Sequence, residues 1–444
     1  MDSETAGREP AGPPADGVSQ FRSANAVHPA GGHRTVTGTH ATPEAPVDLI
    51  FNPWLPEIHA DPYPVYRRMR EEDPVHQPFP GVWMLSRHRD VSALLRNPDV
   101  SSDRRNSPVY EEFIKALPVE PDEGALTPSM LFLDPPDHDR LRRLANKAFT
   151  PRAVDRLVPR IRQVVDGLLD RAAEAGRFDV VADLAYPLPV TVISEMLGVP
   201  EPDRAALRRW SLDLIYTLDP MLSEETLARA QRAGTEFRAY LRELIADRRS
   251  HLGEDLLSGL IQAEDDGRQL SPQELVATCV LLLVAGHETT SSFIGNGVLA
   301  LLRNPHQYRR LHEDPGIMRS AGEELLRYDS PVQLTGRLVM RDTEIAGRRV
   351  EAGQDAVALV GAAYRDPEVF ADPDRLDLGR VDNRHVAFGG GIHFCLGAPL
   401  ARIEGGTAIA SLVRRFPDLH LVTDRPDWRD TVTLRALSSL PVAA

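Results

Sequence analysis

The stretch Phe388-Gly-Gly-Gly-Ile-His-Phe-Cys395-Leu-Gly397 decides the fold of this chain. Its three consecutive glycines allow backbone conformations closed to other residues, and they let a bulky planar group approach the backbone. The apolar segment beginning at Leu396 reads as a helix start, where backbone N–H groups stabilise negative charge on a thiolate. The stretch therefore predicts a metal-ligating thiolate beside a large, flat ligand.

A second informative stretch predicts one long helix. Ser271-Pro-Gln-Glu274 combines an N-cap serine, a proline at the first helical position and a glutamate three residues beyond the cap. The helix can continue to Asn304-Pro305, about 50 Å at 1.5 Å per residue. Its middle, Ala285-Gly-His-Glu288-Thr289-Thr290, places glycine, hydroxyls and a carboxylate within apolar sequence. Because these residues are locally unfavourable there, they indicate function.

Both stretches resemble motifs of the cytochrome P-450 superfamily, the haem-thiolate monooxygenases. The bacterial haem-binding signature is Phe-Gly-x-Gly-x-His-x-Cys-x-Gly, and the oxygen-activation motif is Ala-Gly-x-(Asp/Glu)-Thr. The chain matches both at every fixed position. The resemblance covers roughly residues 46–444. It implies a mainly α fold with small β-sheets (α+β), with haem between the long oxygen-site helix and the cysteine loop.

The resemblance also implies the cofactors and the residues that hold them. Cys395 is the expected axial ligand of the haem iron, and His393 is expected to reach a haem propionate. The other expected cofactor-binding residues are His138, Arg142, Arg337, Phe388 and Gly389. Arginine suits a propionate because its guanidinium donates in a bidentate geometry and keeps its charge. Haem b is the implied cofactor, O2 the co-substrate, and NAD(P)H the indirect source of electrons.

The resemblance assigns catalytic roles to two neighbours in the long helix. Thr289 is expected to hydrogen-bond iron-bound dioxygen or its water network, and Glu288 to relay protons. From the residues alone, an exposed glutamate and a threonine bonded to the carbonyl four residues earlier remain the alternative. Cys279, on the same helix but outside any glycine-rich loop, is expected to be a packed core thiol.

A structural pair is expected behind the cysteine loop. Glu324 and Arg327 share one helical face at i, i+3, a spacing that most often indicates a surface salt bridge. In the family, Glu-x-x-Arg is instead an internal pair, completed by an arginine from a later Pro-x-Arg-Phe segment. Here that segment is Pro373-Asp-Arg375-Leu376, so Arg375 is the expected third member.

Bulk properties narrow the setting of the protein. The net charge of −14 argues against a nucleic-acid-binding surface. Two cysteines are too few for a secreted disulfide framework. The N-terminus lacks the basic and apolar regions of a signal peptide, and the longest apolar run, Val280 to Ala285, is far below the ~20 residues that span a bilayer. We therefore expect a cytoplasmic monomer without a membrane partner.

Residues 1–45 are rich in Pro, Gly, Ala, Thr and His, which predicts a disordered tail. Residues 46–444 are expected to form a single catalytic domain. Periodicity predicts helices over Tyr63 to Glu72, Val154 to Ala175, Thr226 to Ala246, Pro272 to Arg303, Pro315 to Tyr328 and Leu396 to Phe416. Strands are predicted at Val82 to Leu85 and around Arg337 to Val350, with a turn at Ala346-Gly347.

Two irregular segments are expected to border the substrate entrance. Ser107 to Met130 is rich in prolines and acidic residues and predicts a lid, and Ser211 to Glu225, broken at Asp219-Pro220, predicts the opposite lip. A plain surface loop remains the alternative for either segment. By alignment with the family, the residues expected to line the pocket are Leu281, Val284, Ala285, Val332, Gln333 and Val432. These are mostly small and apolar, which indicates a lipophilic ligand.

Three functions compete at this point. The first is a monooxygenase that hydroxylates or epoxidises a secondary metabolite, with electrons from a separate ferredoxin and ferredoxin reductase. Arg143 and Lys147 would belong to the docking patch for the ferredoxin or, alternatively, to an ordinary solvated face. The second is a haem-thiolate enzyme of another type, such as a peroxygenase, an isomerase or a C–C coupling catalyst. The third is a non-catalytic ligand-binding protein. The Glu288-Thr289 pair favours the first.

Overall fold

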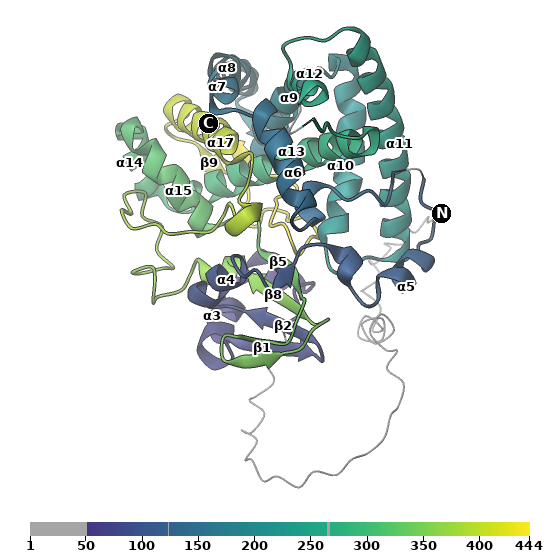
Figure 1. Cartoon of the computed structure of the whole chain (residues 1–444). Helices are drawn as coiled ribbons and strands as arrows, with labels where there is room; N and C mark the ends of the chain where they lie inside the picture. Colours follow the sequence, from purple (N-terminus) through teal and green to yellow (C-terminus); the bar gives the residue numbers. More distant parts are fainter. Residues whose placement is uncertain (1–50, 123, 264–266) are drawn as a thin grey trace, which may run out of the picture.

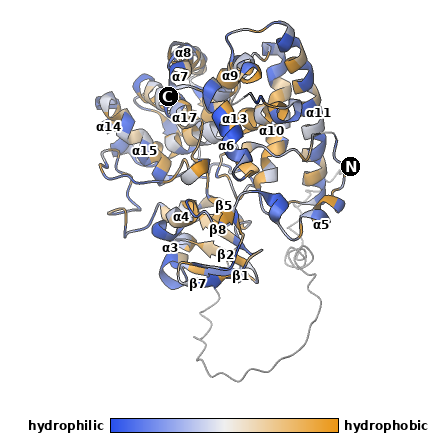
Figure 2. Ribbon diagram, in the orientation of Figure 1, coloured by the Kyte–Doolittle hydropathy of each residue, from blue (hydrophilic) through white to orange (hydrophobic). Residues whose placement is uncertain are grey.

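The computed structural model describes residues 51–122, 124–263 and 267–444, and the predicted tail 1–45 lies outside them. Helices occupy most of the molecule, and the larger sheet lies at one end with α3 and α4 (Figure 1). Hydrophilic and hydrophobic residues alternate around many of the helices (Figure 2), as expected where each helix covers part of a core. The prediction of a mainly α fold with small sheets is confirmed.

The helices form a continuous scaffold around one long central helix. In chain order the described α-helices are α2 (Pro56–Ala60), α3 (Tyr63–Glu72), α4 (His88–Leu94), α5 (Tyr110–Lys115), α6 (Asp137–Ala148), α7 (Pro151–Asp155), α8 (Val158–Ala175), α9 (Pro187–Met196), α10 (Arg204–Ile215), α11 (Glu224–Ser250), α12 (Leu256–Gln262), α13 (Pro272–Leu302), α14 (Pro305–Glu313), α15 (Met318–Tyr328), α16 (Val360–Ala363) and α17 (Ala398–Arg415).

Short 3-10 and π turns link these helices. The 3-10 turns are η1 (Arg104–Asn106), η2 (Met130–Phe132), η4 (Glu201–Asp203), η5 (Tyr216–Leu218), η6 (Pro315–Ile317) and η7 (Gly391–His393), and η3 (Val181–Ala185) is a π turn.

Helix α13 begins where the sequence predicts. The Ser271 hydroxyl accepts from the Glu274 N–H, and the Glu274 carboxylate accepts from the Ser271 N–H, which completes a capping box. The helix packs against α9, α11, α15 and α17. Among the described helices it alone is long and apolar enough to cross a membrane, but 56% of that window is buried inside the protein. It is therefore the core helix of the fold.

Within the described residues, the largest sheet has five strands in the order β1-β2-β8-β5-β3, and two smaller sheets follow the orders β4-β10-β9 and β6-β7. Strand β2 pairs with β8 in parallel, while β5 pairs with β8 antiparallel. The strands are β1 (Val75–Phe79), β2 (Val82–Leu85), β3 (Val100–Ser101), β4 (Arg177–Asp179), β5 (Leu334–Val339), β6 (Thr343–Ile345), β7 (Arg348–Val350), β8 (Asp355–Leu359), β9 (His420–Leu421) and β10 (Pro441–Ala443).

Two sequence predictions about secondary structure have informative outcomes. The turn at Ala346-Gly347 is confirmed, since both residues have positive φ, 52° and 80°, and join β6 to β7. The single helix predicted over Val154 to Ala175 is instead the pair α7 and α8. Pro159, in the first turn of α8, has no N–H to continue a preceding helix, so a new helix begins there.

Candidate haem site

The loop before α17 folds back on itself and presents Cys395. The Cys395 N–H donates to the Phe388 carbonyl at 2.8 Å, which closes the loop. Gly389 and Gly391 have φ of +76° and +65°, a region that side chains rarely adopt. A Cβ on Gly391 would also lie 2.8 Å from the Leu95 carbonyl oxygen at the end of α4. The loop conformation therefore requires glycine at 391.

The Cys395 side chain is exposed, although many protein atoms surround it. Burial raises the pKa of its thiol, while the N–H groups of Gly397 and Ala398 and the charges of Arg142 and Arg402 oppose that shift. Coordination to a metal deprotonates a thiol outright, and these donors would stabilise the resulting thiolate. The sulfur and its surroundings thus fit an iron ligand. By contrast Cys279 is buried, and burial raises the pKa of its thiol to about 12, which fits the predicted core role.

Basic side chains predicted to hold propionates gather beside the cysteine loop. The rings of His138 and His393 meet edge to face, with centroids 4.5 Å apart. Burial and the positive charges of Arg337 and His138 lower the pKa of His393 to about 4. Within the described ranges, neither Arg142 nor Arg337 forms an ion pair with a carboxylate. Such excess positive charge matches a ligand that brings its own carboxylates, as haem does.

Phe388, the first residue of the signature, is fixed from behind. The Arg402 guanidinium lies 4.3 Å from the centre of the Phe388 ring, and the same side chain donates two hydrogen bonds to Glu323 at 2.7 and 2.9 Å. His385 Nε2 lies 3.0 Å from Glu323 Oε2, the oxygen that also accepts from Arg402 Nη2. The cation–π contact and the ion pair together hold the entry to the cysteine loop in place.

The oxygen-site residues of α13 differ in their surroundings. Thr289 Oγ1 donates to the Ala285 carbonyl at 2.8 Å, so the bond to the carbonyl four residues earlier is present. Glu288 is 1% exposed, which excludes the alternative of an exposed carboxylate. Its Oε2 accepts from Arg429 Nη1 at 2.5 Å, and its Oε1 lies 3.1 Å from His287 Nε2. Burial alone would raise the pKa of Glu288, but His287 and Arg429 outweigh it and lower the pKa to about 2.

Two of the predicted pocket residues on α13, Leu281 and Ala285, share one face with Thr289. Leu281, Ala285 and Thr289 are four residues apart, so their side chains lie above one another. Ala285 is exposed in the middle of the helix, and Leu281, Val284 and Thr289 are half-buried. An apolar face of this kind can contact a flat ligand and a lipophilic molecule above it.

The predicted pocket residues from other segments differ in how exposed they are. Val332 is half-buried, and Val432 is buried in a small apolar cluster. Gln333 is buried, with 3% of its surface exposed, and its place in the pocket stays a prediction. Its Nε2 donates to the Ser330 carbonyl at 2.8 Å, and its Oε1 lies against Gly361.

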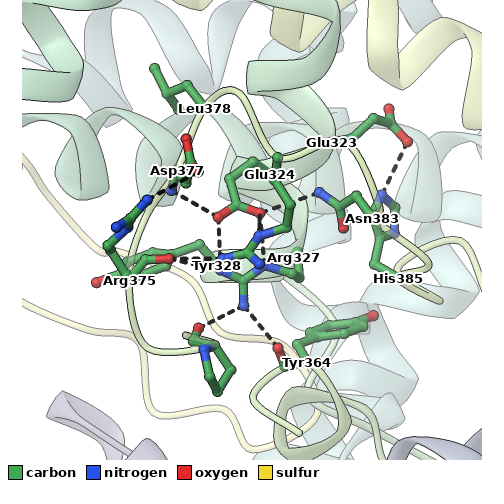
Figure 3. A network of polar contacts seen from close by, with 12 residues as sticks. Glu323, Glu324, Arg327, Tyr328, Tyr364, Arg375, Asp377, Leu378, Asn383 and His385 are labelled. Carbon is green, nitrogen blue, oxygen red and sulfur yellow. Dashed lines mark hydrogen bonds and ion pairs between the residues drawn. The ribbon is translucent and has the colours of Figure 1, made fainter. Parts of the chain in front are cut away.

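The buried pair behind the loop is confirmed, but its predicted third member is wrong. Glu324 and Arg327 are both fully buried and form an ion pair at 2.7 Å (Figure 3). The side chain that completes the network is Arg380, whose Nε donates to Glu324 at 3.0 Å. Arg375 contributes only its backbone carbonyl to Arg327, while its guanidinium, 64% exposed, pairs with Asp377. The turn after Leu376 therefore brings the later arginine to the carboxylate.

The two predicted entrance segments both contact other parts of the protein. In the first, the Val119 backbone exchanges hydrogen bonds with Gln231 of α11. In the second, Asp219 accepts hydrogen bonds from the backbone N–H groups of Val432 and Thr433 at 2.8–3.2 Å. The lip is thereby attached to the C-terminal loop.

A thiolate loop, a carboxylate-binding cluster of bases and an oxygen-site helix define a haem-thiolate protein. The model of the cytochrome P450 family matches residues 76–430. The chain is 42% identical to cytochrome P450 monooxygenase PikC of Streptomyces venezuelae over 419 residues, covering 92% of this chain and 96% of PikC. It is 40% identical to the polyketide biosynthesis cytochrome P450 PksS of Bacillus subtilis, covering 89% and 98%.

Solved structures agree with these relatives. A myxobacterial cytochrome P450 in complex with myristic acid superposes with a TM-score of 0.82 at 43% identity, covering 88% of this chain and 98% of that chain. The chain belongs to the cytochrome P450 family. It is a monooxygenase whose cofactor is haem b, with O2 as co-substrate and electrons from NAD(P)H through redox partners. Family membership thus supports the monooxygenase class to which the first of the three competing functions belongs.

Proposed function

We propose that this enzyme inserts one oxygen atom of O2 into a lipophilic small molecule, by hydroxylation or epoxidation, in a tailoring step of secondary metabolism. The supporting observation is the apolar face of α13 around Ala285. Ala285 is exposed and lies about one helical turn before the buried Glu288. The relatives support the metabolic setting by their names: PksS is a polyketide biosynthesis enzyme, and the myxobacterial structure holds a fatty acid.

Each part of the site would contribute separately to the reaction. Bound haem would supply the oxidising chemistry, and a thiolate ligand suits it to oxygen activation. Cys395 would be the iron ligand, and His138, Arg142, Arg337 and His393 would hold the propionates. Thr289 would offer its hydroxyl as a hydrogen-bond donor to O2, and Glu288 would deliver protons. The apolar residues above them would orient the substrate and exclude water.

Electrons would come from a ferredoxin and its reductase in the cytoplasm. Arg143 and Lys147 are exposed on α6, the helix that also carries Arg142. An acidic ferredoxin docked over these cations would lie near the cysteine loop, so the distance for electron transfer to the haem would be short. Charge reversal at both positions should therefore raise the KM for ferredoxin while leaving the haem spectrum unchanged.

The decisive experiment is the carbon monoxide difference spectrum of the dithionite-reduced protein. A strongly red-shifted Soret band is expected for the wild type and for Cys279→Ala, which alters only a buried thiol, and is lost in Cys395→Ser. Lipophilic candidates, beginning with macrolactones and fatty acids, should then shift the spin state on binding. A wild-type spectrum without the thiolate shift would remove the basis for the proposal.

A further inference from the structure

The residue between Gly286 and Glu288 contributes a second titratable group to the oxygen-site helix. His287 is 2% exposed, and its Nδ1 lies within hydrogen-bond distance of the Leu283 carbonyl one turn earlier. A carbonyl oxygen only accepts hydrogen bonds, so Nδ1 must carry a proton. The protonation state of the residue is then decided at its other ring nitrogen.

Nε2 of His287 faces two oxygen atoms. Glu288 Oε1 lies at 3.1 Å and Tyr186 Oη at 3.3 Å. A carboxylate has no proton to donate, and an unprotonated Nε2 opposite it would place two lone pairs face to face. A proton must therefore lie between Nε2 and Oε1. Because Arg429 already donates to Oε2 at 2.5 Å, the carboxylate is held ionised and the proton belongs to Nε2.

The remaining groups around the imidazole accommodate either protonation state. The ring of Tyr186, at the end of η3, meets the His287 ring edge to face with centroids 5.4 Å apart. Its hydroxyl can accept from a protonated Nε2 or donate to an unprotonated one. Arg208 of α10 lies 4.3 Å from the other side of the Tyr186 ring. Thus the charged groups near the pair are Glu288, Arg429 and, beyond the tyrosine, Arg208.

We propose that His287 is a positioning residue that stores a proton as an imidazolium and passes it to the Glu288 carboxylate for each delivery. The inference rests on the proposed role of Glu288 in proton delivery. In the step, the Nε2–H bond breaks, an Oε1–H bond forms, and the electron pair stays on Nε2. The imidazole is left neutral with its proton on Nδ1, the Tyr186 O–H turns to donate to Nε2, and solvent water later supplies the replacement proton.

The first test reads the proton directly, without catalysis. In 15N-histidine-labelled enzyme, reduced and bound to carbon monoxide so that the iron is diamagnetic, long-range 1H–15N spectra distinguish an imidazolium from either neutral tautomer. At pH 7.5 we expect the signal lost in His287→Gln to be an imidazolium, and to become a neutral Nδ1–H ring in Glu288→Gln. A neutral ring at position 287 in the wild type would overturn the proposal.

His312 supplies a matched control. Its Nδ1 lies 3.1 Å from the Val413 carbonyl, but no carboxylate contacts its Nε2 among the residues that the structure describes. We expect a neutral Nδ1–H ring there at the same pH. An imidazolium at both positions would mean that the spectrum does not report the Glu288 contact, and the inference would fall.

The second test concerns turnover. His287→Gln keeps a donor beside Glu288 but cannot release a proton, so product formed per NAD(P)H should fall about tenfold, below the 10²–10⁴ typical of a direct acid. His312→Gln should not change it. Full coupling in His287→Gln would refute proton supply by His287. If instead Glu288→Gln remained coupled, the proposed role of Glu288 would fail, and a missing thiolate band would count against the monooxygenase itself.

Discussion

The corrected assignment of the buried network leads to a prediction that separates two arginines. The Glu324 carboxylate accepts hydrogen bonds from two nitrogens of Arg327 at 2.7 and 2.8 Å, from the Asp377 N–H at 2.9 Å, from Arg380 at 3.0 Å and from Asn383 at 3.2 Å. Replacing Arg380 by Gln removes one charged donor and leaves the others in place. The carboxylate then still has a buried cation beside it.

The expected loss of stability follows from these contacts. One hydrogen bond between charged groups contributes about 1.5–3 kcal/mol, and the Arg380 Nη1 bond to the Ala371 carbonyl at 2.7 Å adds about 1 kcal/mol. Arg380→Gln should therefore cost about 2.5–4 kcal/mol. Arg375→Gln should cost about 0–1 kcal/mol, because its ion pair with Asp377 is mostly exposed.

Urea unfolding followed by far-UV circular dichroism measures both changes, and the Soret band reports whether haem is retained. Arg380→Gln should lower the urea midpoint clearly and release haem at lower urea, while Arg375→Gln should match the wild type in both. Arg327→Gln provides the upper reference, about 3–5 kcal/mol, since it removes the main counter-charge of a buried carboxylate. Equal destabilisation by the Arg375 and Arg380 variants would refute this account of the network.

Three further predictions address the oxygen site, the lip and pH. Thr289→Ala should divert NAD(P)H electrons from product to peroxide or water while the thiolate band of the carbon monoxide spectrum stays unchanged. The control is Thr290→Ala, which should stay coupled because the Thr290 hydroxyl donates to the Gly286 carbonyl. Unchanged coupling in Thr289→Ala would count against the role of Thr289. Asp219→Ala should speed substrate binding and release several-fold in stopped-flow spectra, because it frees the lip from Val432 and Thr433. The control is Asp430→Ala, since Asp430 is an exposed residue of the C-terminal loop that contains Val432 and Thr433. Equal rates in wild type and Asp219→Ala would contradict the attachment. Burial would raise the pKa of Glu323, but Arg402 and His385 lower it to about 2, below the ~4.3 of an unfolded glutamate. The stabilisation contributed by the ionised Glu323 is therefore present above about pH 4 and lost as the pH falls through about 2. Glu323→Gln should cost about 1–2 kcal/mol at pH 7, after allowance for screening, and little at pH 2. A constant difference in stability across that pH range would be inconsistent with the ion pair between Glu323 and Arg402.

The features that sequence predicted well are those whose chemistry is local. The capping box of α13 depends on Ser271 and Glu274, which are three residues apart, so its outcome needed no knowledge of the rest of the fold. The same holds for the cysteine loop, where the positive φ of Gly389 and Gly391 is set within one turn of backbone. A buried, apolar helix and a glycine-rich loop can therefore be predicted from composition and spacing.

The features that sequence missed are contacts between distant segments. Arg429 lies 141 residues after Glu288 in an irregular loop, and nothing in its neighbours indicates that it reaches the oxygen-site helix. Arg375 and Arg380 both follow the buried pair at plausible distances, and only the path of the turn between them decides which one reaches Glu324. Local patterns do not determine the course of such segments, because long-range packing fixes it.

The C-terminal loop shows why these distant contacts matter for the site. Its Arg429 holds the carboxylate of Glu288, and the N–H groups of Val432 and Thr433, a few residues later, hold Asp219 at the entrance lip. The loop is anchored in turn by backbone hydrogen bonds from Arg429 to Ala436 and from Ser438 to Asp427. One short segment thus fixes the orientation of the oxygen-site acid and the position of the lip. A change in its backbone must alter both sets of contacts, so the proposed proton delivery by Glu288 and the proposed entrance lip are structurally coupled.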